Sequence, residues 1–223
     1  NAEIIDQAAQ RGIKIIVIDS DVNSSQVSCR IGTNNLQAGI KAAEAALATD
    51  DEELYIGIVN YDVNSANGQQ RELGFRQTVE QDPRVKNITT INVLSTTEDA
   101  RAGAKEMLLS DSRINVVVTF NEWTSLGVGW AIRDLNRADR IQVVAFDSNV
   151  VSVGMLETGE VDALIVQNPY AMGYLGVETA ANLMNGQTGG PSVVDTATTI
   201  VTRENMYEPE SQKILFSFEE EGY

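Results

Sequence analysis

The chain has 223 residues, of which 43% are hydrophobic, and its formal net charge is -16. This composition can bury one large core or two smaller ones, and no apolar run approaches the roughly 20 residues that a membrane-spanning helix needs. The negative charge argues against nucleic acid, whose phosphates require a basic face, and the absence of histidine removes the commonest general base and metal ligand.

Strand and helix signals alternate along the chain with a period of roughly 25 to 30 residues, which is typical of βαβ units and a parallel sheet. Apolar runs predict strands over residues 13–18, 27–32, 54–59, 88–94, 116–120, 141–146 and 161–166. The stretches between them predict helices over residues 3–10, 36–48, 71–79, 98–109, 124–135, 150–157 and 172–184. Asn34 or Asn35 can cap the second helix. The number of units is high for one sheet but natural for two.

Five of the apolar runs end in a carboxylate or a carboxamide. These residues are Asp19, Asn60, Asn121, Asp147 and Gln167. Doubly wound α/β proteins bind ligands just beyond the carboxyl ends of their parallel strands, so the pattern predicts a site for a small polar molecule. Alternatives exist for each residue. Asp19 and Asp147 could cap the helices that follow, and Asn121 and Gln167 could be turn residues.

Seven segments resemble, in order and spacing, the successive signatures of the sugar-binding type 1 periplasmic binding proteins, the ribose- and galactose-binding group. They are IDSDVNS, IGTNNLQAG, QQRELGF, TFNEWTSLGVGWAI, VVAFDSN, LIVQNPYAMGYLGV and VDTATTIVTREN. The resemblance implies an α/β fold of two doubly wound parallel-sheet lobes, joined by three crossing strands, that close by a hinge on a ligand in the cleft between them. The effector domains of LacI-type repressors share this fold.

Mapped onto this chain, the resemblance implies two lobes of unequal completeness. Residues 1–33 and 168–195 would form an amino-terminal lobe that lacks the family's usual first two or three strands, and residues 34–167 and 196–206 a complete carboxy-terminal lobe. Residues 207–223 are expected to form an acidic tail. The strand at 13–18 and the apolar face of the helix at 3–10 are then expected to lack part of their cover.

The resemblance also implies which residues bind the ligand: Asp19, Arg71, Asn121, Asp147 and Gln167. Sugar hydroxyls both donate and accept hydrogen bonds, and carboxylates, amides and a guanidinium can satisfy them pairwise. The family often has arginine where this chain has Ser20, so one charged donor is lost. Arg71 could instead be an exposed helix residue paired with an acid, and Asn60 is interpreted as a turn former.

Four further residues are possible ligand contacts: Ser20, Ser65, Asn67 and Trp123. The indole of Trp123 could stack on the apolar face of a pyranose, or it could pack at the start of a helix. Ser65 and Asn67 either line the cleft or cap the helix that contains Arg71.

These features favour an extracytoplasmic substrate-binding protein of an ABC importer, in the periplasm or as a cell-surface lipoprotein, that delivers a monosaccharide or a similar ligand to a membrane permease. The alternatives are the effector-sensing domain of a LacI-type repressor or of a membrane receptor. Repressors tend to end in a longer basic stretch, whereas this chain ends in an acidic one.

An enzyme is the least favoured class. Glycoside hydrolysis would need two carboxylates around the scissile bond, one of them with a raised pKa, and a nearby arginine would lower that pKa. No strand is followed by a glycine-rich nucleotide fingerprint or P-loop, and neither a cofactor nor a metal is expected.

Overall fold

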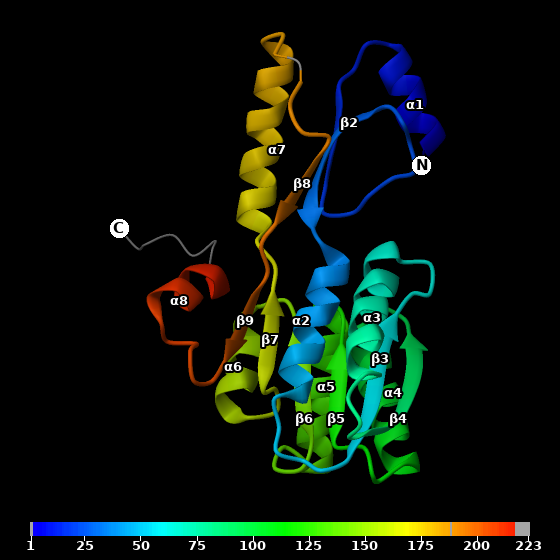
Figure 1. Ribbon diagram of the computed structural model, residues 1–223, viewed down its shortest axis with the longest axis vertical. Helices are drawn as coiled ribbons and strands as arrows, with labels where there is room; N and C mark the ends of the chain where they lie inside the picture. Colours follow the sequence, from blue (N-terminus) through cyan, green and yellow to red (C-terminus); the bar gives the residue numbers. More distant parts are fainter. Residues whose placement is uncertain (1, 188, 217–223) are drawn as a thin grey trace. The chain divides into compact units, whose positions relative to one another are not determined.

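The computed structural model describes residues 2–187 and 189–216, which fold into two compact units (Figure 1). Of the described residues, unit 1 comprises 2–34, 167–187 and 189–198, and unit 2 comprises 35–166 and 199–216. Each unit has its own sheet, so the prediction of an α/β protein with two sheets is confirmed. In the described part of the chain, no helix has both the length and the apolar composition that crossing a membrane would require.

Unit 1 is built on a parallel sheet of three strands in the order β1-β2-β8. The strands are β1 (Ile15–Ile18), β2 (Val27–Thr33) and β8 (Val193–Thr196), and the helices are α1 (Ala2–Gln10) and α7 (Pro169–Met184). Alternate residues of β2 are buried, and its Cys29 and Ile31 form a small core with Met172 of α7. Asp19 directly follows β1, and Gln167 lies two residues before α7.

The first elements of unit 1 are poorly covered, as the sequence predicts. Among the described strands, β1 pairs with β2 alone and forms an edge of the sheet. Helix α1 has no buried residue, and Ile4 on its apolar face is 71% exposed.

Unit 2 contains a sheet of six strands in the order β4-β3-β5-β6-β7-β9, parallel except for β9, which runs antiparallel to β7. The strands are β3 (Leu54–Tyr61), β4 (Val85–Val93), β5 (Val116–Thr119), β6 (Gln142–Phe146), β7 (Ala163–Val166) and β9 (Thr199–Thr202). The helices are α2 (Asn35–Leu47), α3 (Ala66–Val79), α4 (Thr97–Ser110), α5 (Glu122–Leu135), α6 (Val150–Thr158) and α8 (Pro209–Leu215).

Two apolar cores cover the two faces of the unit 2 sheet. Helices α2 and α3 contribute to one of them, and α4, α5 and α6 contribute to the other. Strands β5, β6 and β7 are buried on both faces, which explains why they read as continuous apolar runs in the sequence. The predicted doubly wound arrangement is therefore confirmed for this unit.

Helices α2 and α3 approach each other closely through Gly39 and Gly74. A Cβ atom at Gly39 would clash with the carbonyl oxygen of Arg71, and one at Gly74 would clash with the carbonyl oxygen of Leu36. Only glycine permits this approach. The backbone of Arg71 is consequently held against α2.

Helix α7 begins three residues earlier than the sequence analysis predicts. The side chain of Asn168 accepts a hydrogen bond from the backbone N–H of Ala171 (2.9 Å), and Pro169 occupies the first turn. Proline is favoured there because its missing N–H has no partner in the helix anyway. The QNP segment therefore starts a helix, with the amide of Asn168 and the ring of Pro169 as the helix-start signals.

The interpretation of Asn60 as a turn former is wrong. Asn60 lies inside β3 and is fully buried. Its side-chain nitrogen donates hydrogen bonds to the carboxylate of Glu72 (2.7 Å) and to the carbonyl oxygen of Gly68 (3.3 Å). The residue ties the end of the strand to helix α3, which carries Arg71.

Part of the segment expected as an acidic tail forms a helix in the described residues. Residues 209–215 form helix α8, and Leu215 is buried in the same core as Met206. Two apolar residues, Ile214 and Leu215, give this otherwise polar helix a side that packs on unit 2.

Candidate functional site

Asp147 follows β6 at the carboxyl edge of the unit 2 sheet. Its backbone φ is 65°, in the left-handed region that is uncommon for any residue except glycine but more accessible to aspartate and asparagine. Its backbone N–H donates to the carbonyl oxygen of Ile165 (3.0 Å), and its carboxylate accepts from the backbone N–H of Glu122 (3.1 Å). The side chain is thereby held at the start of α5.

Asn121 lies at the same edge, one strand along, and caps α5. Its side-chain oxygen accepts from the backbone N–H of Thr124 (3.0 Å), and its side-chain nitrogen donates to the hydroxyl of Ser95 (2.7 Å). The amide is half-buried. Asn121 is therefore the N-cap of a helix, which makes the turn-residue alternative wrong.

Arg71 reaches this edge from α3 and is only 2% exposed. Its Nε donates to the side-chain oxygen of Asn35 (2.8 Å), and its Nη1 donates to the carbonyl oxygen of Phe120 (2.6 Å). The guanidinium carbon lies 4.8 Å from the centre of the Phe146 ring. The alternative in which Arg71 is an exposed helix residue is wrong.

The contacts of Arg71 connect three of the predicted ligand residues. Phe120 immediately precedes Asn121, and Phe146 immediately precedes Asp147. The two rings pack edge to face with their centres 5.8 Å apart, which fixes the ends of β5 and β6 together. The structure therefore brings Arg71, Asn121 and Asp147 to one edge of unit 2.

Asp19 follows β1 at the carboxyl edge of the unit 1 sheet. Its φ is 63°, again left-handed, and its backbone N–H donates to the carbonyl oxygen of Ile31 (3.0 Å). The hydroxyl of Ser20 donates to its carboxylate (3.2 Å). Gln167 accepts a hydrogen bond from the hydroxyl of Thr33 (2.7 Å) and is half-buried.

Neither aspartate caps the helix that could follow it. No helix is formed between β1 and β2, where residues 19–26 are described as turns and loops. After β6, Asn149 rather than Asp147 is the N-cap of α6. The capping alternative is therefore wrong for both residues. A left-handed non-glycine residue costs of order 1–3 kcal/mol, and such strain is concentrated at functional sites.

The four possible ligand contacts differ in their surroundings. Trp123 is 49% exposed in the first turn of α5, and Ser20 is exposed beside Asp19. Ser65 is the N-cap of α3, with its hydroxyl accepting from the backbone N–H of Gly68 (3.5 Å). Asn67 accepts a hydrogen bond from the side chain of Asn35 (3.3 Å).

Sequence reasoning missed two residues that organise the unit 2 edge. Asn35 was expected only as a helix cap, but it holds Arg71. Ser125 bonds to the backbone of both Asn121 and Phe146, through the carbonyl oxygen of the first (2.7 Å) and the N–H of the second (2.9 Å). The only sequence signal for either was a polar residue at the start of a predicted helix.

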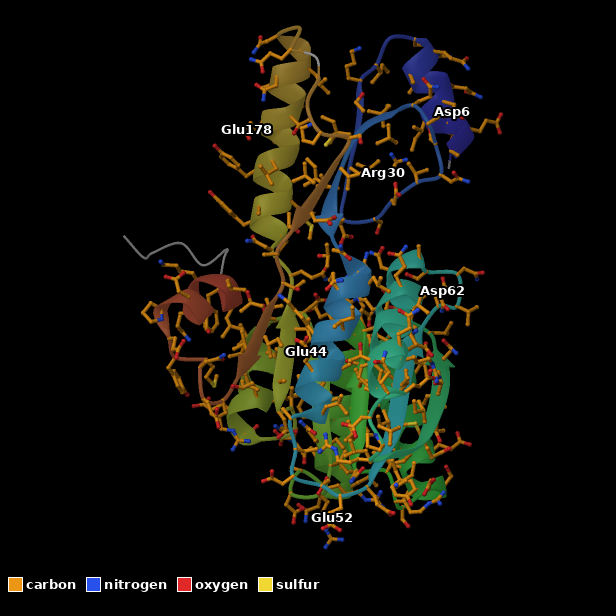
Figure 2. All side chains as sticks on the ribbon, viewed as in Figure 1. Asp6, Arg30, Glu44, Glu52, Asp62 and Glu178 are labelled. Carbon is orange, nitrogen blue, oxygen red and sulfur yellow. The ribbon has the colours of Figure 1, made fainter. Side chains whose placement is uncertain are left out.

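A cavity of about 840 Å³ lies at the opposite, amino edge of the unit 2 sheet. Figure 2 marks the two edges, with Glu52 at the amino edge and Asp62 at the carboxyl edge. The residues that line the cavity include Asn115, Asp162 and Arg203, and none of the predicted ligand residues lines it. Burial raises the pKa of Asp162.

The described residues contain no cluster of acidic or cysteine side chains that could hold a metal ion.

Residues 1–188 match the family model of the periplasmic binding protein domain. Among curated proteins, the D-ribose/D-allose-binding protein of Pseudomonas aeruginosa is 25% identical over 211 residues, which cover 89% of this chain and 65% of that protein. The ribose import binding protein of Haemophilus influenzae is 25% identical over 187 residues, covering 81% of this chain and 61% of that protein. The chain thus spans less than two thirds of the length of these relatives.

Solved structures give the same result. The solute-binding protein of a carbohydrate transporter from Agrobacterium radiobacter, in complex with D-arabinose, matches with a TM-score of 0.90 and 29% identity over 96% of this chain and 74% of that one. A sugar-binding protein of a sugar ABC transporter from Bacillus halodurans matches with a TM-score of 0.86 and 28% identity over 92% and 75% of the two chains. These matches agree with the predicted fold class.

Proposed function

We propose, because the chain belongs to the periplasmic binding protein domain family, that it binds a monosaccharide or a similar small polar ligand for an ABC importer. Family membership confirms the resemblance read from the sequence. The similar proteins are sugar-binding proteins of ABC transport systems, and the sugars that their names state include ribose, allose, arabinose and fucose. The family consists of transport proteins, and we propose no catalytic role.

The proposed ligand residues are Asp19, Arg71, Asn121, Asp147 and Gln167. The observation that carries this choice is the geometry shared by Asp19 and Asp147, each left-handed and each bonded through its N–H to the neighbouring strand. Carboxylates presented in this way can accept hydrogens from sugar hydroxyls, and a guanidinium can donate to ring or hydroxyl oxygens. Our proposal includes the hinge closure that the family resemblance implies.

The possible contacts remain part of this proposal. Trp123 would stack on the apolar face of the sugar ring, and Ser20 would add a hydroxyl beside Asp19. Asn67 and Ser65 would act from the start of α3, where their present hydrogen bonds already fix their side chains.

We further propose a membrane permease as the partner and an extracytoplasmic location, in the periplasm or on the cell surface. The support is the names of the relatives, which are import and periplasmic binding proteins. Cell fractionation tests this part separately, because recovery of the protein from the cytoplasm would contradict the importer role and leave sugar binding intact.

Isothermal titration calorimetry on the full-length protein tests sugar binding. The panel is D-ribose, D-allose, D-arabinose and D-fucose, with L-leucine and ATP as controls. We expect at least one monosaccharide to bind with a Kd of roughly 1 μM or lower, equivalent to about 8 kcal/mol of binding free energy, and neither control to bind. Tighter binding of a control than of any monosaccharide would contradict the proposed ligand class.

A further inference from the structure

Asn35 is the first residue of α2 and is 8% exposed. Its side-chain oxygen accepts from Nε of Arg71 (2.8 Å), and its side-chain nitrogen donates to the side-chain oxygen of Asn67 (3.3 Å). Arginine has only donors, so the oxygen of the Asn35 amide must be the atom that faces it. Both ends of the amide are therefore in use, and its orientation is fixed by its partners.

Three contacts fix the guanidinium of Arg71 in position. Asn35 binds Nε, the carbonyl oxygen of Phe120 binds Nη1, and the ring of Phe146 lies 4.8 Å from the guanidinium carbon. Hydrogen bonds to two different nitrogens define both the direction and the plane of the group. Of the two hydrogen bonds, the one to Phe120 is accepted by a backbone carbonyl, whereas the one to Asn35 is accepted by a side chain that substitution can remove.

Helix α2 also fixes the backbone of Arg71. Gly39, one turn after Asn35, leaves room for the carbonyl oxygen of Arg71 against α2. Helix α2 thus fixes the position of the Arg71 backbone and, through Asn35, the direction of the Arg71 side chain.

We propose that Asn35 is a positioning residue that orients the guanidinium of Arg71 toward the ligand. It raises sugar affinity by acting through Arg71 and makes no contact with the sugar. This inference rests on the proposed function, in which Arg71 binds the sugar directly.

A double-mutant cycle on the full-length protein tests the inference, with calorimetry of the tightest-binding monosaccharide of the panel as the measurement. Asn35→Ala is expected to weaken binding by about 10-fold, the size of one hydrogen bond to a charged group. In an Arg71→Met background the same change is expected to cost less than about 2-fold, because the residue it positions is gone. Asn87→Ala, an exposed asparagine on β4, is the matched control and should leave affinity unchanged.

Asn35→Asp provides an independent readout, since it keeps the oxygen that accepts from Nε. We expect this variant to bind within about 3-fold of the parent, measured at a temperature where every variant is folded. The affinity of Asn35→Asp tests the positioning role even if Arg71→Met binds sugar too weakly to measure. An Asn35→Asp variant that binds as weakly as Asn35→Ala would overturn the inference.

Two other outcomes separate this inference from the proposed function. An Asn35→Ala loss of equal size with and without Arg71, or no loss at all in a parent that binds sugar, would overturn the positioning role alone. A parent that binds no monosaccharide of the panel would overturn the proposed function and this inference with it.

Discussion

Replacing Asp147 with asparagine is expected to weaken monosaccharide binding by about one to two orders of magnitude. A charged hydrogen-bond partner in a desolvated site contributes roughly 1.5–3 kcal/mol, and each 1.4 kcal/mol changes affinity tenfold. Asparagine tolerates the left-handed backbone at this position, so the variant removes the charge without adding backbone strain. Calorimetry with the best sugar of the panel measures the effect.

Asp147→Ala is expected to weaken binding at least as much, because it removes both oxygens and places alanine in an unfavourable conformation. Arg71→Ala should cost a similar amount. Asp139→Ala is the matched control, an exposed aspartate beside the cavity at the amino edge of unit 2. Binding of the Asp147 and Arg71 variants within about 2-fold of the parent would show that these residues are not ligands.

Asn60→Ala is unsuitable as a neutral control, although the sequence suggests it. The change would remove a buried partner of the Glu72 carboxylate and would cost about 1–3 kcal/mol of stability.

Gly39→Ala is expected to lower the free energy of unfolding by about 3 kcal/mol. The added methyl group would clash with backbone, at the carbonyl oxygen of Arg71, so the helices α2 and α3 must separate to accept it. Urea denaturation with an unchanged slope would report this loss as a lower midpoint.

Gly154→Ala is the control for that experiment. Gly154 lies inside α6, and a Cβ atom there would meet nothing within 4 Å. Because alanine favours the helix, this variant should be as stable as the parent or more stable by about 0.5–1 kcal/mol. Equal stability of the Gly39→Ala variant and the parent would mean that α2 and α3 are not packed as described.

The strands of unit 2 could be predicted from the sequence because a strand that is buried on both faces of a parallel sheet consists of a continuous apolar run. Strands β5 and β6 were placed to within one residue at each end for this reason. Asn60 was misread because its partner Glu72 lies 12 residues further along the chain. No local pattern shows that a polar residue at the end of a run is buried and paired.

In the candidate site too, features set by neighbouring residues could be predicted, and features set by residues distant in the sequence could not. The positions of Asp19 and Asp147 after strands were visible in the sequence, but their left-handed backbone was not. Capping by Asp147 could be rejected only because Asn149 caps α6, and capping by Asp19 only because no helix follows it before β2. The pairing of Asn35 with Arg71 spans 36 residues and depends on the packing of α2 against α3, so the sequence alone could not reveal it.

A crystal structure of the full-length protein with its tightest-binding monosaccharide tests the central claim most directly. The account predicts sugar oxygens within about 2.6–3.2 Å of the carboxylates of Asp19 and Asp147 and of the guanidinium of Arg71. A sugar that contacts none of these residues, for example one bound in the cavity at the amino edge of unit 2, would contradict it.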